Sequence, residues 1–294
     1  MAVKAGSRFV DVPGGRVWCE VVGAGAGLPL VVLHGGPGFP HSYVRSLEAL
    51  ADERPVVFYD QLGCGLSDRP DDTSLWTTER AVAELAEVRR SLELDRFHLL
   101  GQSWGSMLAT DYALTRPGGI ASLILASPCL SIPRWVEDAA RFRHALPADV
   151  QQVIDSHEAA GHTACPEYIA AMLVYYKRHV CRMEPWPEEL ERTFAGEGHQ
   201  VYETMWGPSE FTVTGSLRDF DRSGRLHEMD VQTLFTCGRY DEATPETVGW
   251  YSSLLPGAEL TVFEESSHLA HLEERDAYNA VARAFLHRCE GRRD

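Results

Sequence analysis

The 294-residue chain lacks the long apolar segment that a membrane helix requires. Hydrophobic residues make up 44% of it, but they lie in short runs. None of these runs approaches the roughly 20 apolar residues that span a bilayer. The first ten residues carry Lys4 and Arg8 and have no apolar signal-peptide core. We therefore expect a cytoplasmic protein that does not bind membranes.

Paired cysteines and excess positive charge are also missing. The seven cysteines are an odd number and form no CxxC pair, which argues against a disulfide framework and against a zinc site. Basic residues number 27 against 43 acidic ones, a net charge of −16. Such a charge repels phosphate backbones, so nucleic-acid binding is disfavoured and a cationic ligand is more compatible.

Short apolar runs that end at Gly, Pro or Asp recur through the N-terminal part of the chain. They occupy residues 30–33, 56–59, 97–100 and 123–126. Runs of this length, closed in this way, predict strands that are buried on both faces of a sheet. Between the second and third runs, one helical face is formed by Ala81, Val82, Leu85, Val88 and Leu92, after Thr77 or Thr78 as a cap. The alternation predicts an α/β fold with a mostly parallel sheet and helices on both sides.

After residue 128 the pattern changes. Residues 129–228 show several helical patterns and no strong strand signal, and strand-like runs return at 233–237 and 260–263. The simplest interpretation is an α/β core over 1–128 and 229–294, interrupted by a helical cap. Ligand crevices in open α/β sheets lie beyond the carboxyl ends of the strands, so we expect the cap to cover the site. A packing appendage is the alternative.

A candidate nucleophile lies where a predicted strand meets a predicted helix. The segment from Gly101 to Gly105 reads GQSWG and matches the GxSxG pattern. A tight strand-to-helix elbow needs small residues on either side of the nucleophile, whose hydroxyl it lifts clear of the sheet. We therefore predict that Ser103 is the nucleophile rather than an ordinary buried turn serine.

A serine hydroxyl needs a general base, and the base needs an orienting acid. In this fold class the three follow in the order Ser, acid, His. Asp241 comes just after the 233–237 run and His268 just after the 260–263 run, so we favour these two. Glu242 and His271 lie close to them in the sequence and are the rival candidates.

The reaction also needs two hydrogen-bond donors for the oxyanion. One should be the backbone N–H of Trp104, the residue after the nucleophile. The other should come from the HGGPG segment after the first apolar run. Pro37 has no N–H, and we take Gly36 as the donor, with Gly35 or Gly38 as alternatives. A phosphate-binding role is disfavoured because the segment lacks the GxGxxG and GKT/S spacings.

Together, these residues resemble the proline iminopeptidase (prolyl aminopeptidase) family of α/β-hydrolases, the S33 peptidases. The resemblance covers nearly the whole chain and rests on HGGPG with His41 following, DQLGCGLS at 60–67, GQSWG at 101–105, WGPSEF at 206–211, GRYDE at 238–242 and SHLAHLE at 267–273. It implies an α/β-hydrolase fold with an inserted helical cap. It also implies release of an N-terminal residue, typically proline, from short peptides.

The resemblance further implies that two glutamates bind the free amine of the substrate. One follows the triad aspartate and maps onto Glu242, and the other lies in the GP-x-EF segment and maps onto Glu210. Tyr202 is a weaker pocket candidate by the same resemblance. A carboxylate pair suits this task because it offers a cationic terminus charge-assisted hydrogen bonds that an internal peptide bond cannot use. One departure is Ser106, where the family usually has a second glycine.

The sequence thus predicts a serine hydrolase that forms an acyl-enzyme and needs no metal or organic cofactor. Its substrate would be a small peptide, or an amino-acid amide or ester, with a free amine. Cys64 is expected to be structural. An amidase, an esterase or a biosynthetic deacylase of the same fold is the alternative, and a non-catalytic ligand-binding protein on this scaffold is a further one. Serine at the elbow disfavours a dehalogenase or an epoxide hydrolase, which use aspartate there.

Overall fold

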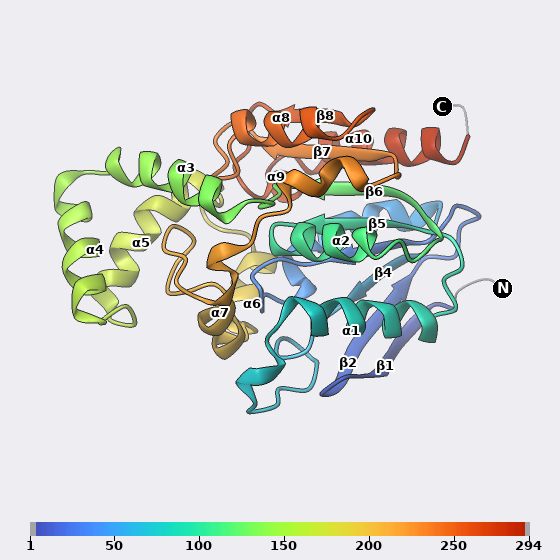
Figure 1. Ribbon diagram of the computed structural model, residues 1–294, viewed down its shortest axis with the longest axis horizontal. Coiled ribbons are helices and arrows are strands. Elements are labelled where there is room, and N and C mark those ends of the chain that lie inside the picture. Colours follow the sequence, from blue (N-terminus) through green and yellow to red (C-terminus); the bar gives the residue numbers. More distant parts are fainter. Residues whose placement is uncertain (1–3, 292–294) are drawn as a thin grey trace.

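The computed structural model describes residues 4–291, and these form one eight-stranded sheet flanked by helices (Figure 1). The strand order is β1-β2-β4-β3-β5-β6-β7-β8. The strands are β1 (Gly6–Val12), β2 (Gly15–Val22), β3 (Leu30–Leu33), β4 (Val56–Tyr59), β5 (Phe97–Gln102), β6 (Ile120–Ala126), β7 (Thr233–Gly238) and β8 (Glu259–Phe263). Strand β2 is antiparallel to both neighbours and the remaining pairs are parallel. The predicted α/β-hydrolase fold is confirmed.

The strands β1 and β2 are absent from the strands predicted above. They form an antiparallel hairpin whose register pairs Gly6 with Val21 and Val12 with Gly15. Buried and exposed side chains alternate along both strands, because only one face of this hairpin packs on the core. The charged residues at the exposed positions hide these strands from a search for continuous apolar runs.

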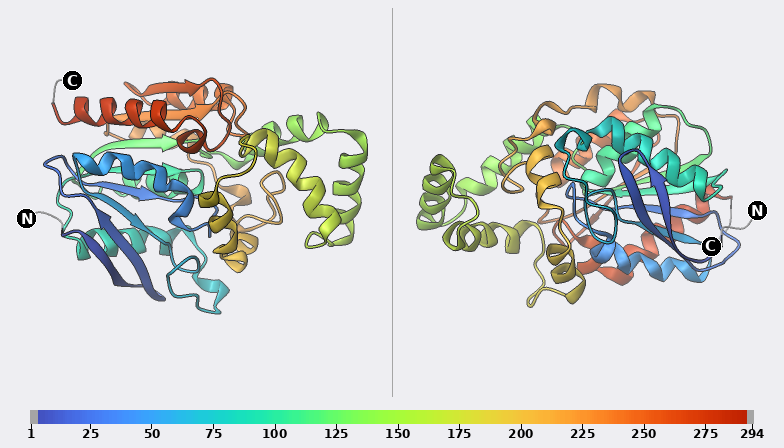
Figure 2. Two further views of the ribbon diagram at one scale, coloured as in Figure 1. Left: turned by 180° about the vertical axis from the view of Figure 1, so that it is seen from behind. Right: turned by 90° about the horizontal axis from the view of Figure 1, so that it is seen from below.

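The central strands are buried on both faces because each separates two hydrophobic cores. In β3, Val31 and Leu33 contribute to one core, while Leu30 and Val32 contribute to the other. The first core receives side chains from α1 (Thr78–Ser91), α2 (Trp104–Leu114) and α8 (Pro245–Leu254). The second core receives them from the 3₁₀ helix η1 (His41–Asp52), α9 (Ala270–Glu273) and α10 (Arg275–Cys289). Figure 2 shows η1 and α10 on the face opposite α1 and α2. The helix predicted over residues 81–92 is confirmed, and the side chain of Thr77 caps it by accepting from the Arg80 N–H at 3.2 Å.

The chain between β6 and β7 is helical, as predicted. Its elements are α3 (Ile132–His144), α4 (Ala148–Ala160), α5 (Pro166–His179), α6 (Glu188–Ala195), α7 (His199–Met205) and the 3₁₀ helices η3 (Ser216–Asp219) and η4 (Ser223–Glu228). A further short 3₁₀ helix, η2 (Thr73–Leu75), precedes α1. Helices α4 and α5 lie furthest from the sheet (Figures 1 and 2). The division into a core over 1–128 and 229–294 and a cap over 129–228 stays a prediction. Within residues 4–291, no helix is long and apolar enough to cross a membrane.

Candidate active site

Ser103 lies in a strained turn between β5 and α2. Its φ of 54° and ψ of −121° lie in a region that side-chain-bearing residues rarely adopt. The flanking glycines are required by close contacts. A Cβ on Gly101 would lie 2.1 Å from the carbonyl oxygen of Gly105, and one on Gly105 would lie 2.2 Å from that of Leu33. The GxSxG segment therefore forms the tight elbow that its pattern predicts.

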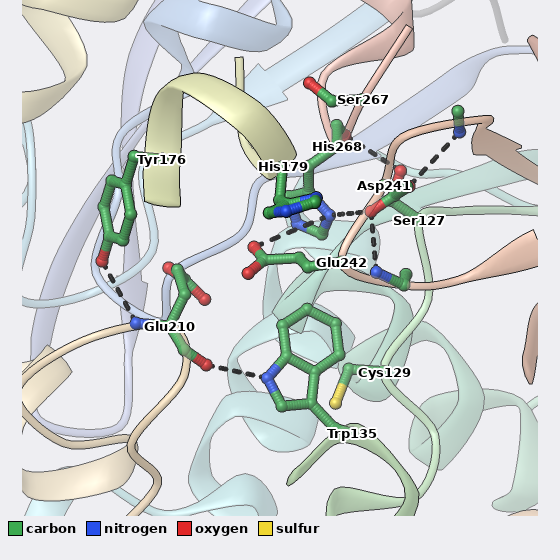
Figure 3. A network of polar contacts seen from close by, with 12 residues as sticks. Ser127, Cys129, Trp135, Tyr176, His179, Glu210, Asp241, Glu242, Ser267 and His268 are labelled. Atoms are coloured by element: carbon green, nitrogen blue, oxygen red, sulfur yellow. Dashed lines mark hydrogen bonds and ion pairs between the residues drawn. The ribbon is translucent and has the colours of Figure 1, made fainter. Parts of the chain in front are cut away.

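The loops after β7 and β8 bring Asp241 against His268. The Nδ1 atom of His268 lies 2.7 Å from Oδ1 of Asp241 (Figure 3). The aspartate is fixed by two backbone N–H donors, Ala243 at 2.8 Å to Oδ1 and Gly238 at 3.3 Å to Oδ2. Burial lowers the pKa of His268, but the carboxylates of Asp241 and Glu210 outweigh it, so that this pKa is raised above its usual value.

The two rival residues are placed differently. Oε1 of Glu242 lies 4.0 Å from Nδ1 of His268, beyond hydrogen-bonding distance. His271 is buried against the rings of Tyr43 and Tyr278, and burial lowers its pKa to about 3. The geometry therefore favours Asp241 and His268 as the orienting acid and the base.

Ser103 and His268 line the same small cavity, together with Gly36. The apolar side chains of its wall come both from the loops around the sheet and from the helical segment between β6 and β7. They are Phe39, Val180, Leu190, Phe194 and Leu269. The cavity measures about 20 Å³, which is room for about one water molecule. A substrate therefore requires some of these side chains to move.

The contacts of the glycine-rich loop distinguish the three glycines that could donate an N–H to the oxyanion. The N–H of Gly35 donates to the hydroxyl oxygen of Tyr43 at 2.6 Å, so this alternative is already engaged. Gly38 does not line the cavity, and its carbonyl accepts from the N–H of Gly198 at 2.8 Å. Gly36 lines the cavity and has a φ of 106°. Trp104 is not one of the residues that line the cavity, but it follows Ser103 and begins α2, so its N–H has no partner within the helix.

Glu210 and Glu242 are both buried, and Figure 3 shows them pointing toward the same space beside His268. The backbone of Glu210 is held on both sides, since its N–H donates to the Tyr176 hydroxyl at 3.1 Å and its carbonyl accepts from the Trp135 indole N–H at 2.8 Å. Its Oε1 accepts from the Tyr202 hydroxyl at 2.9 Å. The Oε2 atom of Glu210 and both carboxylate oxygens of Glu242 make no hydrogen bond of good distance and angle within residues 4–291, although the Tyr175 hydroxyl lies near enough to Glu242 to oppose the rise in its pKa.

These two carboxyl groups are costly to ionise together. Burial raises the pKa of Glu210 to about 7. Burial and the nearby charges of Glu210 and Asp241 raise the pKa of Glu242 well above its usual range. Three unpartnered carboxylate oxygens in a buried space form a site that a cation would stabilise.

Comparison with known proteins identifies the family of the chain. Residues 29–275 match the family described as the alpha/beta hydrolase fold. A proline iminopeptidase of Heyndrickxia coagulans is 50% identical over 280 residues, which is 95% of this chain and 97% of the relative. The chain belongs to the proline iminopeptidase family of α/β-hydrolases. The crystal structure of the Mycobacterium smegmatis proline iminopeptidase is 39% identical, with a TM-score of 0.89 over 97% of this chain and 98% of that one. The crystal structure of VinJ is also 39% identical, with a TM-score of 0.94 over 97% and 99%.

This proline iminopeptidase family member has a second buried cluster of side chains whose types could bind a metal ion, namely His34, Asp60 and Cys64. Ligand atoms of His34, Asp60 and Cys64 lie within 4.8 Å of one another, but the protein already uses them. His34 Nε2 accepts from the N–H of Gln61 at 2.9 Å, Asp60 accepts from backbone N–H groups, and the Cys64 thiol donates to the Gln61 carbonyl at 3.3 Å. Burial raises the pKa of the Cys64 thiol and keeps it protonated. These contacts fit the structural role predicted for Cys64.

Two further residues of the site were not predicted, because Ser127 lies outside the motifs above and Gln102 occupies a variable position of GxSxG. Ser127, which follows β6 with a φ of 47°, donates its hydroxyl hydrogen to the His268 carbonyl at 2.9 Å. The side-chain N–H of Gln102 donates to the same carbonyl at 3.3 Å. Both therefore hold the loop that carries the histidine. Ser106, the departure noted above, donates to the Ser103 carbonyl at 2.5 Å and accepts from the Cys129 N–H at 3.3 Å.

Proposed function

We propose that this protein is a serine aminopeptidase that releases an N-terminal residue, preferably proline, from short peptides. The observation that carries the proposal is the buried pair Glu210 and Glu242, whose three unpartnered oxygens lie beside the Ser103 and His268 cavity. The names of the relatives above support the preference for proline.

In the proposed mechanism, His268 takes the proton of the Ser103 hydroxyl as the oxygen attacks the carbonyl carbon of the N-terminal residue. The backbone N–H groups of Gly36 and Trp104 stabilise the oxyanion. Asp241 holds the imidazole with Nδ1 protonated, so that Nε2 is free to act as the base. The ring then gives its proton to the departing amine, and water hydrolyses the acyl-enzyme.

The carboxylate pair makes the enzyme an exopeptidase in this proposal. The ammonium of the substrate donates to Oε2 of Glu210 and to the oxygens of Glu242, while Tyr202 fixes the orientation of the Glu210 carboxylate. An internal peptide bond brings no ammonium to this space, so it leaves the buried carboxyl groups without a partner. The apolar wall of the cavity then accommodates the side chain of the substrate.

Initial rates on prolyl, alanyl, leucyl and N-acetyl-prolyl arylamides test the proposal. We expect the prolyl substrate to be hydrolysed fastest and the acetylated one scarcely at all. Ser103→Ala should lower kcat by roughly 10⁴-fold or more. Ser46→Ala is the matched control, because it removes a buried hydroxyl that has no hydrogen-bond partner within residues 4–291.

A Ser103→Ala variant with near-wild-type turnover would refute the mechanism. Hydrolysis of prolyl amides and esters without release of proline from prolyl dipeptides would instead assign the same chemistry to an amidase or an esterase.

A further inference from the structure

A chain of hydrogen bonds joins the three loops that carry the proposed catalytic groups. The N–H of Gly35 donates to the Tyr43 hydroxyl oxygen at 2.6 Å. The Tyr43 hydroxyl donates in turn to the side-chain oxygen of Gln102, the residue before Ser103. The side-chain N–H of Gln102 donates to the backbone carbonyl of His268 at 3.3 Å. The glycine-rich loop, the elbow and the histidine loop are therefore connected through two side chains.

The direction of each hydrogen bond in this chain is fixed by chemistry. The backbone carbonyl of His268 can only accept, so the Gln102 amide turns its N–H toward it and its oxygen toward Tyr43. The Tyr43 hydroxyl therefore donates its one hydrogen to that oxygen while it accepts from the Gly35 N–H. Burial raises the pKa of Tyr43, so the hydroxyl keeps its proton.

Three residues of this chain, Gly35, Tyr43 and Gln102, are also packed closely against Ser103. A Cβ on Gly35 would lie 2.7 Å from the Gln102 side-chain oxygen, 2.8 Å from the Tyr43 hydroxyl oxygen and 3.0 Å from Cβ of Ser103. Tyr43 and Gln102 are 2% and 1% exposed, and both line the cavity that contains Ser103 and His268. The position of the glycine-rich loop relative to the nucleophile therefore depends on the Tyr43 hydroxyl.

We propose that Tyr43 is a positioning residue for the reaction. By binding the N–H of Gly35, its hydroxyl leaves the next N–H, that of Gly36, to face the oxyanion. Through Gln102, the same hydroxyl fixes the position of the Gly36 donor relative to His268. The inference rests on the proposed function, because it assumes an oxyanion formed by attack of Ser103.

Loss of the hydroxyl should therefore affect the transition state and not the binding of the amine. Removing one oxyanion-hole donor lowers kcat by about 10²–10³-fold, and a displaced donor should cost less than a missing one. For Tyr43→Phe we expect kcat to fall about tenfold to a hundredfold while KM stays within about twofold of wild type. An activated ester without an amine should lose as much as a prolyl arylamide, because both form the same oxyanion.

Tyr251→Phe provides the matched control. Tyr251 is 1% exposed and its hydroxyl oxygen also accepts a backbone N–H, that of Ser131, at 3.0 Å. It does not line the cavity. Both variants should therefore lose similar stability in thermal unfolding, and only Tyr43→Phe should lose kcat.

A double-mutant cycle with Gln102→Met sharpens the test. Since Tyr43 and Gln102 act through one chain of hydrogen bonds, the double variant should lose little more kcat than the worse single variant. Losses that multiply would overturn the inference. So would a Tyr43→Phe enzyme with wild-type kcat, or one in which only KM changes.

If Tyr43→Phe does not fold, Gln102→Met alone must show the same fall in kcat at constant KM, and a wild-type kcat for it would overturn the inference. Failure of the proposed function is separate, since it would show as Ser103→Ala retaining activity.

Discussion

A substrate in which carbon replaces the proline nitrogen removes the group that the buried carboxylates are proposed to bind. Cyclopentanecarbonyl arylamide keeps the size and shape of prolyl arylamide but has no ammonium. The prolyl ammonium has two N–H donors, and Glu210 and Glu242 together offer three unpartnered oxygens. A hydrogen bond to a charged group contributes about 1.5–3 kcal/mol, so two of them contribute about 3–6 kcal/mol. The expected preference for the prolyl substrate is therefore about 10²–10⁴-fold in kcat/KM.

The pH sets where in this range the preference falls. With the neutral analogue bound, no ammonium compensates the charge of the buried carboxyl pair. Below a pH of about 7 the Glu210 carboxyl binds a proton, which lowers the free-energy cost of leaving the pair without a cation. The ratio of the two kcat/KM values should therefore rise between pH 6 and pH 8, once it is corrected for ionisation of the substrate amine. Steady-state rates of the two arylamides across this range provide the measurement.

Glu210→Gln and Glu242→Gln should reduce this ratio by lowering kcat/KM for the prolyl substrate much more than for the cyclopentyl one. Glu84→Gln is the matched control, because Glu84 is also a buried carboxyl group but binds Arg80 and the N–H of Leu62. The ratio of kcat/KM for the prolyl substrate to kcat/KM for the cyclopentyl one should be the same in Glu84→Gln as in the wild type. Equal losses on both substrates in the Glu210 and Glu242 variants would refute amine binding by this pair.

Three further predictions follow from the geometry of the elbow and the triad. The kcat/KM for prolyl arylamide should fall as the pH drops through about 7, because Glu210 loses its charge there, and protonation of His268, whose pKa is raised above its usual value, should lower kcat/KM further; a pH profile that is flat from 5 to 8 would contradict this. Asp241→Asn should lower kcat by roughly 10⁴-fold at neutral pH, because the amide favours the wrong imidazole tautomer. Gly105→Ala should destabilise the fold by about 1–3 kcal/mol, because its Cβ would lie 2.2 Å from a backbone carbonyl of β3. Gly224→Ala, whose Cβ would have no neighbour within 4 Å, should not, and thermal unfolding compares the two.

The sequence predicts the central strands well because each combines a continuous apolar run with a Gly, Pro or Asp at its end. Once these strands are located, the contact between Asp241 and His268 is also predictable. Both residues follow parallel strands, and side chains in that position lie at the same edge of the sheet. The strands β1 and β2 are missed because one face of their hairpin is polar and breaks the apolar pattern.

The choice among the glycines of the HGGPG loop could not be made from the sequence. It depends on which N–H points into the cavity, and that depends on Tyr43, which lies eight residues further along in η1. No periodicity connects Tyr43 with Gln102, because their contact exists only once η1 packs against the sheet. Likewise, the unpartnered oxygens of Glu242 follow from burial that only the assembled fold creates.

Covalent labelling of the nucleophile tests the central claim most directly. A fluorophosphonate reacts with a serine hydroxyl that a neighbouring base activates, and peptide mapping by mass spectrometry identifies the modified residue. We predict one phosphonyl adduct, on Ser103, and a labelling rate that falls at least about a hundredfold in His268→Ala. An adduct on another residue, or labelling of His268→Ala at the wild-type rate, would contradict the account.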